Sequence, residues 1–312
     1  CRISRPATDE MDRVFTVAPA AKINLHLEIF GRRPDGWHEL RTVYQSIDLR
    51  DHLTVEPTRD DELSLVVAPA GAVTDGEDNL VLRAARLVRR RTGCERGARF
   101  VLRKRIPVEA GLGGGSADAA AAIVLLRRLW GCDLDAKRMD GLARELGSDV
   151  PFFLHGGLAL GSGRGDELSE LPDPEAFWVV VAVPEVRVPT SEVFARLRPR
   201  LTSHRHGGTL DPLAAGLRGR FDWREMTNEL EGVVLEGWPE VGGCLRMLRS
   251  QDPVHTSMSG SGGACFSVFR DEAAARRASC GLPENWFVHV GTTVPRSSAR
   301  LEVEALCDGG GR

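Results

Sequence analysis

A glycine-rich segment in the middle of the chain carries the strongest chemical signal. It consists of Gly111, Leu112, Gly113, Gly114, Gly115 and Ser116, and an alanine-rich stretch with helical character follows it. A helix that starts after such a loop has unpaired backbone N–H groups at its positive end, where phosphate oxygens bind. The Ser116 hydroxyl could add a ligand for a phosphate or for Mg²⁺. The alternative is a tight turn in which Ser116 only caps the helix, but four glycines between a strand and a helix favour phosphate binding.

The segment differs from the widespread phosphate-binding motifs. No lysine follows the glycines, as the P-loop pattern requires, and Ser116 occupies the last glycine position of the G-x-G-x-x-G pattern. The chain also lacks the H-R-D and D-F-G sequences of protein kinases, the G-x-S-x-G sequence of hydrolases and a complete H-E-x-x-H zinc motif. The loop therefore predicts a phosphate site of another kind.

Two charged residues in apolar surroundings are candidates for catalysis. Asp149 lies in Gly-Ser-Asp-Val-Pro-Phe-Phe, where a partly desolvated carboxylate can accept the proton of an attacking hydroxyl if a cation keeps it ionised. Its position alone slightly favours a turn or capping role. Lys22 lies beside Asn24 on an otherwise apolar strand, so its ammonium needs a partner or access to solvent. A facing phosphate or carboxylate and simple exposure fit the sequence equally well.

Two further segments carry candidate binding groups. Trp37 and His38 offer an aromatic surface beside a hydrogen-bonding ring, which suits stacking on a base, although such a pair more often marks a packed loop. A second glycine motif is a candidate nest of backbone amides or a flexible turn. It consists of Ser259, Gly260, Ser261 and Gly262.

The apolar pattern predicts the elements that position these groups. One or two strands are expected over residues 15–30, with Lys22 and Asn24 on one face, and the first eighty residues are β-rich. Further strands are expected over 40–49, 52–57, 100–106, 178–183 and 264–269, and in the apolar run after Asp149. Helices are expected over 78–93, 116–131, 134–146 and 272–279. Residues 202–208 are expected to be a polar loop in which His204 and His206 are solvated rather than bound to metal.

Composition excludes several classes of protein. The 312 residues are 42% hydrophobic and carry a net charge of −3, so we expect a folded core without general attraction to nucleic acid or anionic membrane. No apolar run approaches the ~20 residues that cross a bilayer, and the first twelve residues, with Met11 as a candidate start, lack a secretory signal. Seven scattered cysteines without C-x-x-C spacing indicate reduced thiols in a cytoplasmic protein. A disordered tail is expected over 308–312.

Five motifs, in this order, resemble those of the GHMP kinase superfamily. They are Pro19–Leu25, Pro34–His38, Gly111–Ala117, Gly147–Phe153 and Ser259–Gly262, and together they span most of the chain. The first two are most similar to members that use ATP to phosphorylate the 2-hydroxyl of 4-diphosphocytidyl-2-C-methyl-D-erythritol, in the non-mevalonate route to isoprenoids. The resemblance implies a two-domain α/β (α+β) fold. A ribosomal protein S5-like domain is expected over residues 12–163 and a ferredoxin-like domain over residues 164–307.

The resemblance also implies roles for the candidate catalytic residues. Asp149 would be the base that deprotonates the 2-hydroxyl. Lys22 would hold that hydroxyl and the carboxylate in register, and Asn24 would orient the methylerythritol. The glycine loop up to Ser116 would wrap the phosphates of ATP and the accompanying Mg²⁺.

Binding residues at the two ends of the site follow from the same resemblance. His38 would hydrogen-bond the cytosine, and the rings of Trp37 and Phe194 would stack on its two faces. Phe194 follows the family's Pro189-Thr190 element. Thr190 is therefore also expected to face the substrate. The expected neighbours of the adenosine are Asn79, Leu80 and Lys104.

The sequence departs from the family pattern at two places. Tryptophan stands at position 37, where tyrosine is usual, so stacking is kept while a phenol hydroxyl is lost. Glu109-Ala110 stands where many members have further glycines, which should stiffen the entrance of the loop and place an acid near the phosphates.

Two alternative functions stay open on the sequence. One is another GHMP kinase, acting on homoserine, mevalonate or a sugar. The other is a non-catalytic nucleotide- or RNA-binding module, because S5-like domains occur in ribosomal proteins. The acidic balance and the presence of both Lys22 and Asp149 favour an enzyme. We therefore expect a small-molecule substrate, ATP and Mg²⁺, and a monomer or homodimer.

Overall fold

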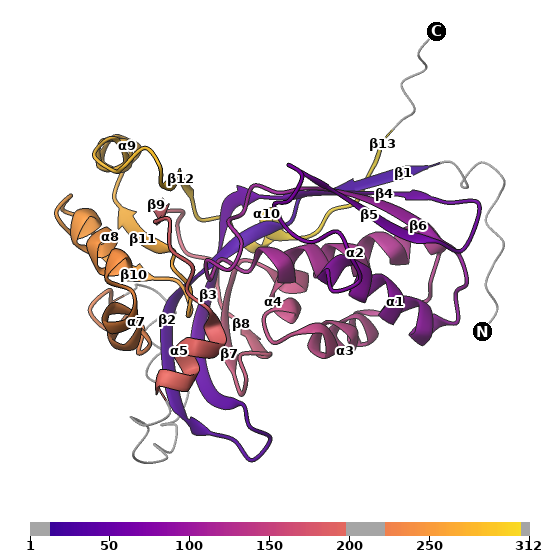
Figure 1. The fold of residues 1–312 in the computed structure, drawn as a ribbon, viewed down its shortest axis with the longest axis horizontal. Coiled ribbons are helices and arrows are strands. Elements are labelled where there is room, and N and C mark those ends of the chain that lie inside the picture. The colour runs from indigo at the N-terminus through magenta and orange to yellow at the C-terminus, as the bar shows by residue number, and fades with distance from the viewer. Residues whose placement is uncertain (1–12, 198–221, 307–312) are drawn as a thin grey trace, which may run out of the picture.

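Three β-sheets and the helices packed on them make an α+β fold in residues 13–197 and 222–306, which the computed structural model describes (Figure 1). The first sheet has the order β13-β1-β4-β6-β5, the second β2-β3-β7-β8 and the third β10-β11-β9-β12. The strands are β1 (Val14–Val17), β2 (Ala20–Arg32), β3 (His38–Arg50), β4 (His52–Pro57), β5 (Leu63–Ala68), β6 (Ala98–Arg103), β7 (Leu158–Ser162), β8 (Glu167–Glu170), β9 (Trp178–Val183), β10 (His255–Met258), β11 (Cys265–Phe269), β12 (Phe287–Thr292) and β13 (Glu304–Leu306). The helices are α1 (Leu80–Thr92), α2 (Gly114–Trp130), α3 (Ala136–Leu146), α4 (Val150–His155), α5 (Thr190–Leu197), α7 (Glu231–Gly237), α8 (Pro239–Arg249), α9 (Glu272–Cys280) and α10 (Arg296–Ala299).

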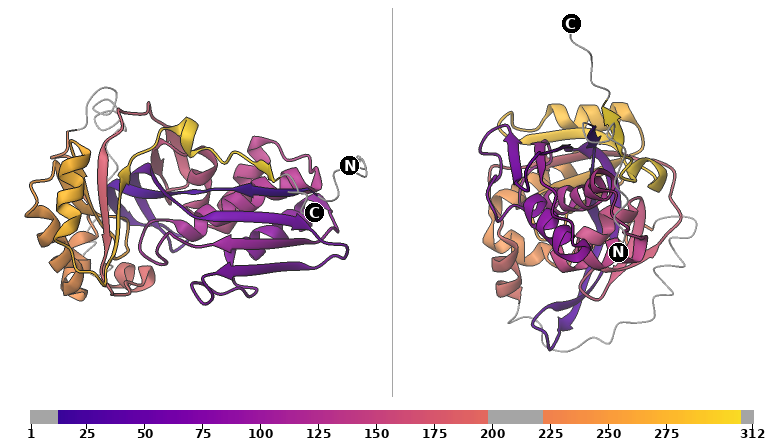
Figure 2. Two further views of the ribbon diagram at one scale, coloured as in Figure 1. Left: turned by 90° about the horizontal axis from the view of Figure 1, so that it is seen from above. Right: turned by 90° about the vertical axis from the view of Figure 1, so that its right-hand side faces the viewer.

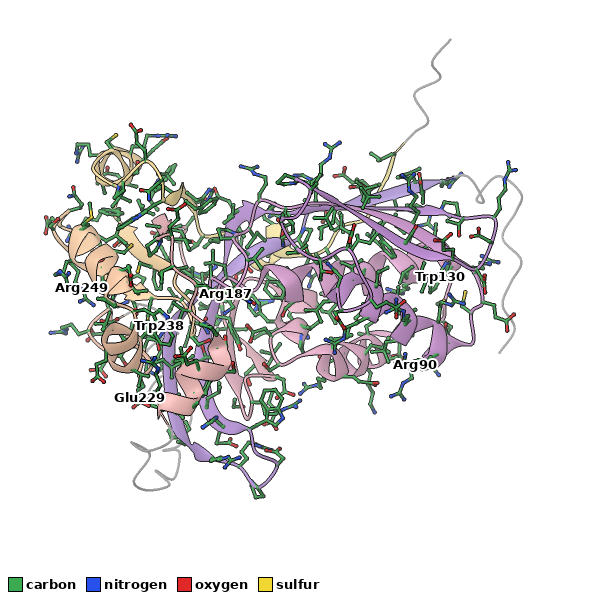
Figure 3. All side chains as sticks on the ribbon, viewed as in Figure 1. Arg90, Trp130, Arg187, Glu229, Trp238 and Arg249 are labelled. Carbon is green, nitrogen blue, oxygen red and sulfur yellow. The ribbon has the colours of Figure 1, made fainter. Side chains whose placement is uncertain are left out.

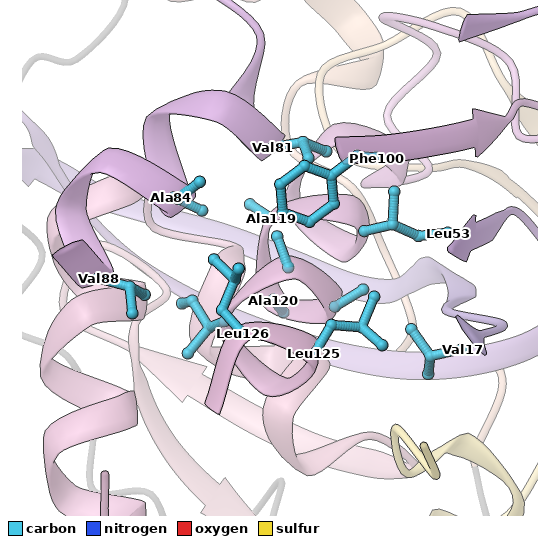
Figure 4. Packing of buried hydrophobic residues seen from close by; sticks show 14 of the residues in the cluster. Val17, Leu53, Val81, Ala84, Val88, Phe100, Ala119, Ala120, Leu125 and Leu126 are labelled. Atoms are coloured by element: carbon cyan, nitrogen blue, oxygen red, sulfur yellow. The ribbon is translucent and has the colours of Figure 1, made fainter. Parts of the chain in front are cut away.

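Helix α2 is the centre of the N-terminal core. Alanine is the most frequent residue on its buried face, and Ala119 and Ala120 are fully buried. Small side chains let the helix approach its neighbours closely, so α1 packs beside it while larger residues of the first sheet, such as Phe100 and Leu53, fill the space opposite (Figure 4). The start of α2, where the glycine loop ends, is therefore held by a tightly packed core.

The second sheet joins the two halves of the molecule. Its long strands β2 and β3 pair antiparallel, and their apolar residues share a core with β9 and β11 of the third sheet. Single bridges, Leu27 to Asn228 and Ile47 to Thr293, tie these strands to C-terminal segments. Helices α7, α8 and α9 lie with the third sheet at one end of the molecule, and α1–α4 lie with the first sheet at the other (Figure 2).

Most expected elements are confirmed, since strong caps and clear alternation fix them locally. Helix α1 begins after Asn79, whose Oδ1 accepts a hydrogen bond of 2.9 Å from the Val81 N–H, and ends at Gly93 in the left-handed region. Strand β9 has the predicted bounds, and the expected β-rich start consists of β1 to β5.

Two local expectations are wrong. Helix α2 starts at Gly114, not Ser116, and its cap is Gly113, with φ 73° and no side-chain capping bond. A serine is disfavoured in that left-handed conformation, so the helix starts directly after the glycine that permits it. The apolar run after Asp149 is helix α4 rather than a strand, because Pro151 fits the first turn of a helix and the run is too short for periodicity to decide.

The expected domain boundary at residue 163 stays a prediction. Strand β8 lies beyond it yet pairs with β7, and β13, near the C-terminus, returns to pair with β1. The expectations for Met11, for the loop with His204 and His206, and for the tail over 308–312 lie outside the described residues. Among the described helices, none has the length and apolar character needed to cross a membrane.

Candidate active site

The predicted base and the predicted lysine lie side by side. Lys22 Nζ is 3.3 Å from Asp149 Oδ2 and donates a hydrogen bond of 2.6 Å to Asn24 Oδ1. The Lys22 side chain is 3% exposed, whereas that of Asp149 is 32% exposed. A buried ammonium needs oxygen partners, so the pair satisfies Lys22 while one side of the carboxylate stays open to a substrate. Simple exposure of Lys22 is therefore excluded.

The Asp149 carboxylate is available for chemistry because it does not cap α4. Asp149 lies in a turn and occupies the N-cap position, as its place in the sequence predicts, but its side chain makes no capping hydrogen bond. Instead, Asp149 Oδ1 accepts a hydrogen bond of 3.1 Å from the hydroxyl of Tyr44 on β3. Burial and the neighbouring charge of Asp149 raise the pKa of Tyr44 well above its ordinary value, so the phenol stays a donor.

Tyr44 is a site residue that the sequence analysis missed. It is the only tyrosine in the chain, and it pairs with Asn24 in the antiparallel register of β2 and β3. Its ring lies 5.5 Å from Lys22 Nζ. The signal was present as a lone polar aromatic on the predicted strand 40–49, but only the strand pairing places it beside Lys22.

A buried hydrogen-bond network links Asn24 to the glycine loop. Asn24 Nδ2 donates to Thr42 Oγ1 at 2.7 Å, and the Asn24 N–H donates to Ser259 Oγ at 3.2 Å. The Ser259 hydroxyl is 2.9 Å from the Gly111 carbonyl, to which it donates. The fully buried serine therefore fixes β2, the loop and the C-terminal motif relative to one another.

The glycine loop lies directly against Lys22. The Lys22 N–H donates to the Leu112 carbonyl at 3.0 Å, and a β-carbon on Gly113 would lie only 3.2 Å from Lys22 Cε and 2.5 Å from Phe153. The first helical bond of α2 runs from the Ala117 N–H to the Gly113 carbonyl at 2.9 Å. The amides of residues 114–116 precede that bond, at the positive end of the helix, where a phosphate group can bind.

The C-terminal glycine motif packs on this loop backbone to backbone. The Ala264 N–H donates to the Ala110 carbonyl at 3.0 Å, and a β-carbon on Gly262 would overlap the backbone of Ala110. A β-carbon on Gly111 would likewise overlap the Ser259 carbonyl. The motif thus supports the loop from the C-terminal half, and both segments need glycine at the point of contact.

Of the three residues expected near adenosine, two begin α1 beside the loop. Asn79 caps the helix, and Leu80 Cδ1 is 3.4 Å from the position that a β-carbon on Gly115 would take. Lys104 also lies near the start of α2, but its ammonium is buried and paired with two aspartates, Asp51 and Asp118. A contact of Lys104 with adenine stays a prediction.

The residues expected to bind the cytosine gather at the tip of the β2–β3 hairpin and on α5. The His38 ring stacks on Phe194, with centroids 4.7 Å apart, and Thr190 Oγ1 is 2.8 Å from Ser261 Oγ. Trp37 is 54% exposed, and the Arg164 guanidinium lies 5.4 Å from its ring centroid. The structure therefore brings Phe194 to His38 and leaves the Trp37 ring largely open.

The acid at the loop entrance is neutralised. The Glu109 carboxylate forms a two-pronged ion pair with Arg187, in which Nη2 donates to Oε1 at 2.8 Å. Arg187 lies in the middle of the molecule, where the two halves meet (Figure 3). Glu109 has a φ of 56°, a conformation that favours glycine. The expected repulsion of phosphate is therefore countered by Arg187.

No cluster of three or more His, Cys, Asp or Glu side chains suited to a metal occurs in residues 13–197 and 222–306. Mg²⁺ in nucleotide sites keeps several waters and binds through phosphates and few protein groups. Ser116, in the first turn of α2, is half-buried and fits such a limited role.

Comparison with known proteins places the chain in a family. The model of the GHMP kinases N terminal domain matches residues 79–157, and that of the GHMP kinases C terminal domain matches residues 220–287. A 4-diphosphocytidyl-2-C-methyl-D-erythritol kinase from Synechococcus sp. (strain CC9605) is 41% identical over 280 residues, covering 85% of this chain and 91% of the relative. The chain belongs to this GHMP kinase family.

Solved structures agree with the sequence match to the 4-diphosphocytidyl-2-C-methyl-D-erythritol kinase family. A crystal structure of 4-(cytidine 5'-diphospho)-2C-methyl-D-erythritol kinase has a TM-score of 0.74 at 35% identity, covering 89% of this chain and 98% of the other. A homoserine kinase from Cytophaga hutchinsonii has a TM-score of 0.69 at 18% identity, covering 98% of this chain and 100% of the other, which shows a shared fold alone. The expected GHMP kinase fold is confirmed.

Gly262→Ala should displace the glycine loop, because the added methyl group meets the Ala110 backbone, which cannot move aside as a flexible side chain can. We expect kcat/KM to fall about a hundredfold or more, since small misplacements of reacting groups cost that much. The matched control is Gly263→Ala, whose β-carbon has only ordinary contacts, at 3.4 Å, with Val186 and Val188. Steady-state kinetics and thermal melts of both variants test this, and equal activity of the two would contradict the proposed contact.

Tyr44→Phe removes the hydroxyl that holds Asp149 Oδ1 but keeps the ring beside Lys22. We expect kcat to fall about tenfold with both KM values within about twofold, because the lost bond orients a reacting group rather than a bound ligand. Kinetics with each substrate varied in turn provide the measurement. A higher KM at unchanged kcat would assign Tyr44 to substrate binding instead.

Proposed function

We propose that this chain transfers the γ-phosphoryl group of ATP to the 2-hydroxyl of 4-diphosphocytidyl-2-C-methyl-D-erythritol. The observation that carries the proposal is the contact of Lys22 with Asp149 directly beside the glycine loop, in a chain of this kinase family. Phosphoryl transfer needs placement and charge neutralisation more than covalent help, and this arrangement supplies both.

Asp149 acts as the base for the attacking hydroxyl. Its carboxylate is one-third exposed, so a substrate oxygen can reach it, while Lys22 and Tyr44 hold its two oxygens from the buried side. The Lys22 ammonium lies 3.3 Å from the carboxylate that accepts the proton. The same ammonium lies beside the loop, where it also stabilises the negative charge on the transferring group.

The amides at the start of α2 hold the ATP phosphates. Those of residues 114–116 point out of the helix at its positive end, and Gly115 is exposed. Mg²⁺, when bound, neutralises charge on the phosphate oxygens, and Ser116 is the side chain that we propose to hold it. Asn79 and Leu80 line the adenosine side of the same loop.

The cytidine end of the substrate binds between the β2–β3 hairpin and α5. His38, placed by its stack on Phe194, reads the base, and the open face of Trp37 supplies stacking surface.

We place the reaction in the cytoplasm. All five cysteines that the structure describes are free thiols, as a reducing compartment requires: Cys94, Cys132, Cys244, Cys265 and Cys280.

An ADP-release assay with ATP, Mg²⁺ and the cytidylated methylerythritol tests the function. We expect turnover with this alcohol and none above background with homoserine or mevalonate. Asp149→Asn should lower kcat roughly 100- to 10,000-fold, as loss of a general base does, while nucleotide affinity is kept. Preference for an alcohol without cytidine would overturn the assignment, and full activity of Asp149→Asn would remove its role as base.

Trp37→Ala and His38→Ala should chiefly weaken binding of the cytidylated substrate. We expect its KM to rise about tenfold or more in each variant while kcat and the KM for ATP change little, because neither side chain touches the reacting atoms. Trp37→Phe is the matched control, since it keeps an aromatic face, and should stay within about threefold of the original KM. A drop in kcat alone would place these residues in the chemical step.

A further inference from the structure

A buried charge cluster lies beneath the start of the glycine loop. Lys104 Nζ donates to Asp118 Oδ2 at 2.8 Å and to Asp51 Oδ2, and all three side chains are at most 5% exposed. Lys104 follows β6, Asp51 lies between β3 and β4, and Asp118 is on α2. One ammonium therefore joins three elements that are separate in the sequence.

Asp51 holds the chain just ahead of the loop. Its Oδ1 accepts hydrogen bonds from the Arg105 N–H at 2.6 Å and from the Ile106 N–H at 2.9 Å. The Asp51 N–H donates to the Pro19 carbonyl at 3.2 Å, which also links the cluster to the segment before β2. Residues 104–106 are thus fixed where the chain leaves β6 for the loop.

Asp118 holds the chain just after the loop. It lies in the second turn of α2, and a β-carbon on Gly114, the first residue of that helix, would lie 3.0 Å from Lys104 Nζ. The ammonium therefore lies against the first turn of α2 while its two carboxylates bind the chain before and after the loop. Both ends of the segment 107–113 are fixed through a single side chain.

The cluster carries one more negative than positive charge when fully ionised. Burial raises the pKa of Asp118 to about 7, and the charge of Asp51 acts in the same direction, whereas Lys104 opposes it. Asp118 Oδ1 is buried and makes no hydrogen bond.

We propose that Asp51 and Asp118 are positioning residues, which act through Lys104 to hold both ends of the loop that binds the ATP phosphates. The inference rests on the proposed function, since it takes that loop to be the ATP site. A loop rich in glycine has many backbone conformations to lose, so anchoring its ends reduces the entropy cost of aligning its amides on phosphate.

The test compares Asp118→Ala with Asp118→Asn. Alanine removes the acceptor of the Lys104 hydrogen bond, whereas asparagine keeps an oxygen in that place. We expect the Kd for a non-hydrolysable ATP analogue, measured by calorimetry, to rise about tenfold for alanine and less than about threefold for asparagine. The KM for ATP should follow the same order, with kcat and the KM for the alcohol within about twofold. Asp133→Ala, at an exposed position after α2, is the control and should match wild type.

A purely structural role predicts a different result. It would lower the melting temperature of Asp118→Ala while leaving the analogue Kd unchanged, or weaken both substrates equally, and either result overturns the inference. Wild-type protein that binds the analogue but phosphorylates no alcohol would count against the proposed function alone. Wild-type protein that binds no analogue would contradict both the proposed function and the inference about Asp51 and Asp118.

Discussion

The site depends on compensating one buried positive charge, that of Lys22. An ammonium removed from water needs oxygen partners, because burying it unpaired costs several kcal/mol. The oxygens come from Asn24, two positions along the same strand, and from Asp149 at the start of α4. This requirement fixes the start of α4 against the second sheet, and Tyr44 on β3 completes the contact. The Lys22 ammonium, which needs a partner for stability, is thus held beside Asp149, where the proposed reaction takes place.

The second constraint is the close approach of two backbones. Loop residues Ala110 and Gly111 meet Ser259 and Gly262 with no room for a side chain between them. The Ser259 hydroxyl donates to the Gly111 carbonyl and the Asn24 N–H donates to Ser259 Oγ, so the C-terminal half helps to determine where the glycine loop lies. The C-terminal motif therefore controls the geometry of the glycine loop. This explains how a glycine motif far along the chain belongs to the same site.

The parts that the sequence predicted well are those that local chemistry fixes. Helix α1 has a strong cap at each end, and β9 is an apolar run of ordinary strand length. The pairing of Lys22 with Asp149 followed from the resemblance, since residue types alone left Lys22 undecided and favoured a cap for Asp149. Tyr44, Asp51 and Asp118 were missed because their roles depend on strand pairing and on helix packing between remote segments. The start of α2 was misplaced because a side-chain cap was expected where a left-handed glycine serves.

The two lysines near the loop show why residue type alone does not give a role. Lys22 has one carboxylate partner, which is one-third exposed, so its charge can act on a group that binds beside it. Lys104 is shared between two carboxylates that are both buried, and withdrawing it would leave their charges uncompensated at a cost of roughly 3–5 kcal/mol. Its ammonium is therefore committed to the protein. Under the proposed function, attraction of the phosphates comes from the amides of α2, from Lys22 and from the metal that accompanies the nucleotide, and the role proposed for Lys104 is to keep those amides in place.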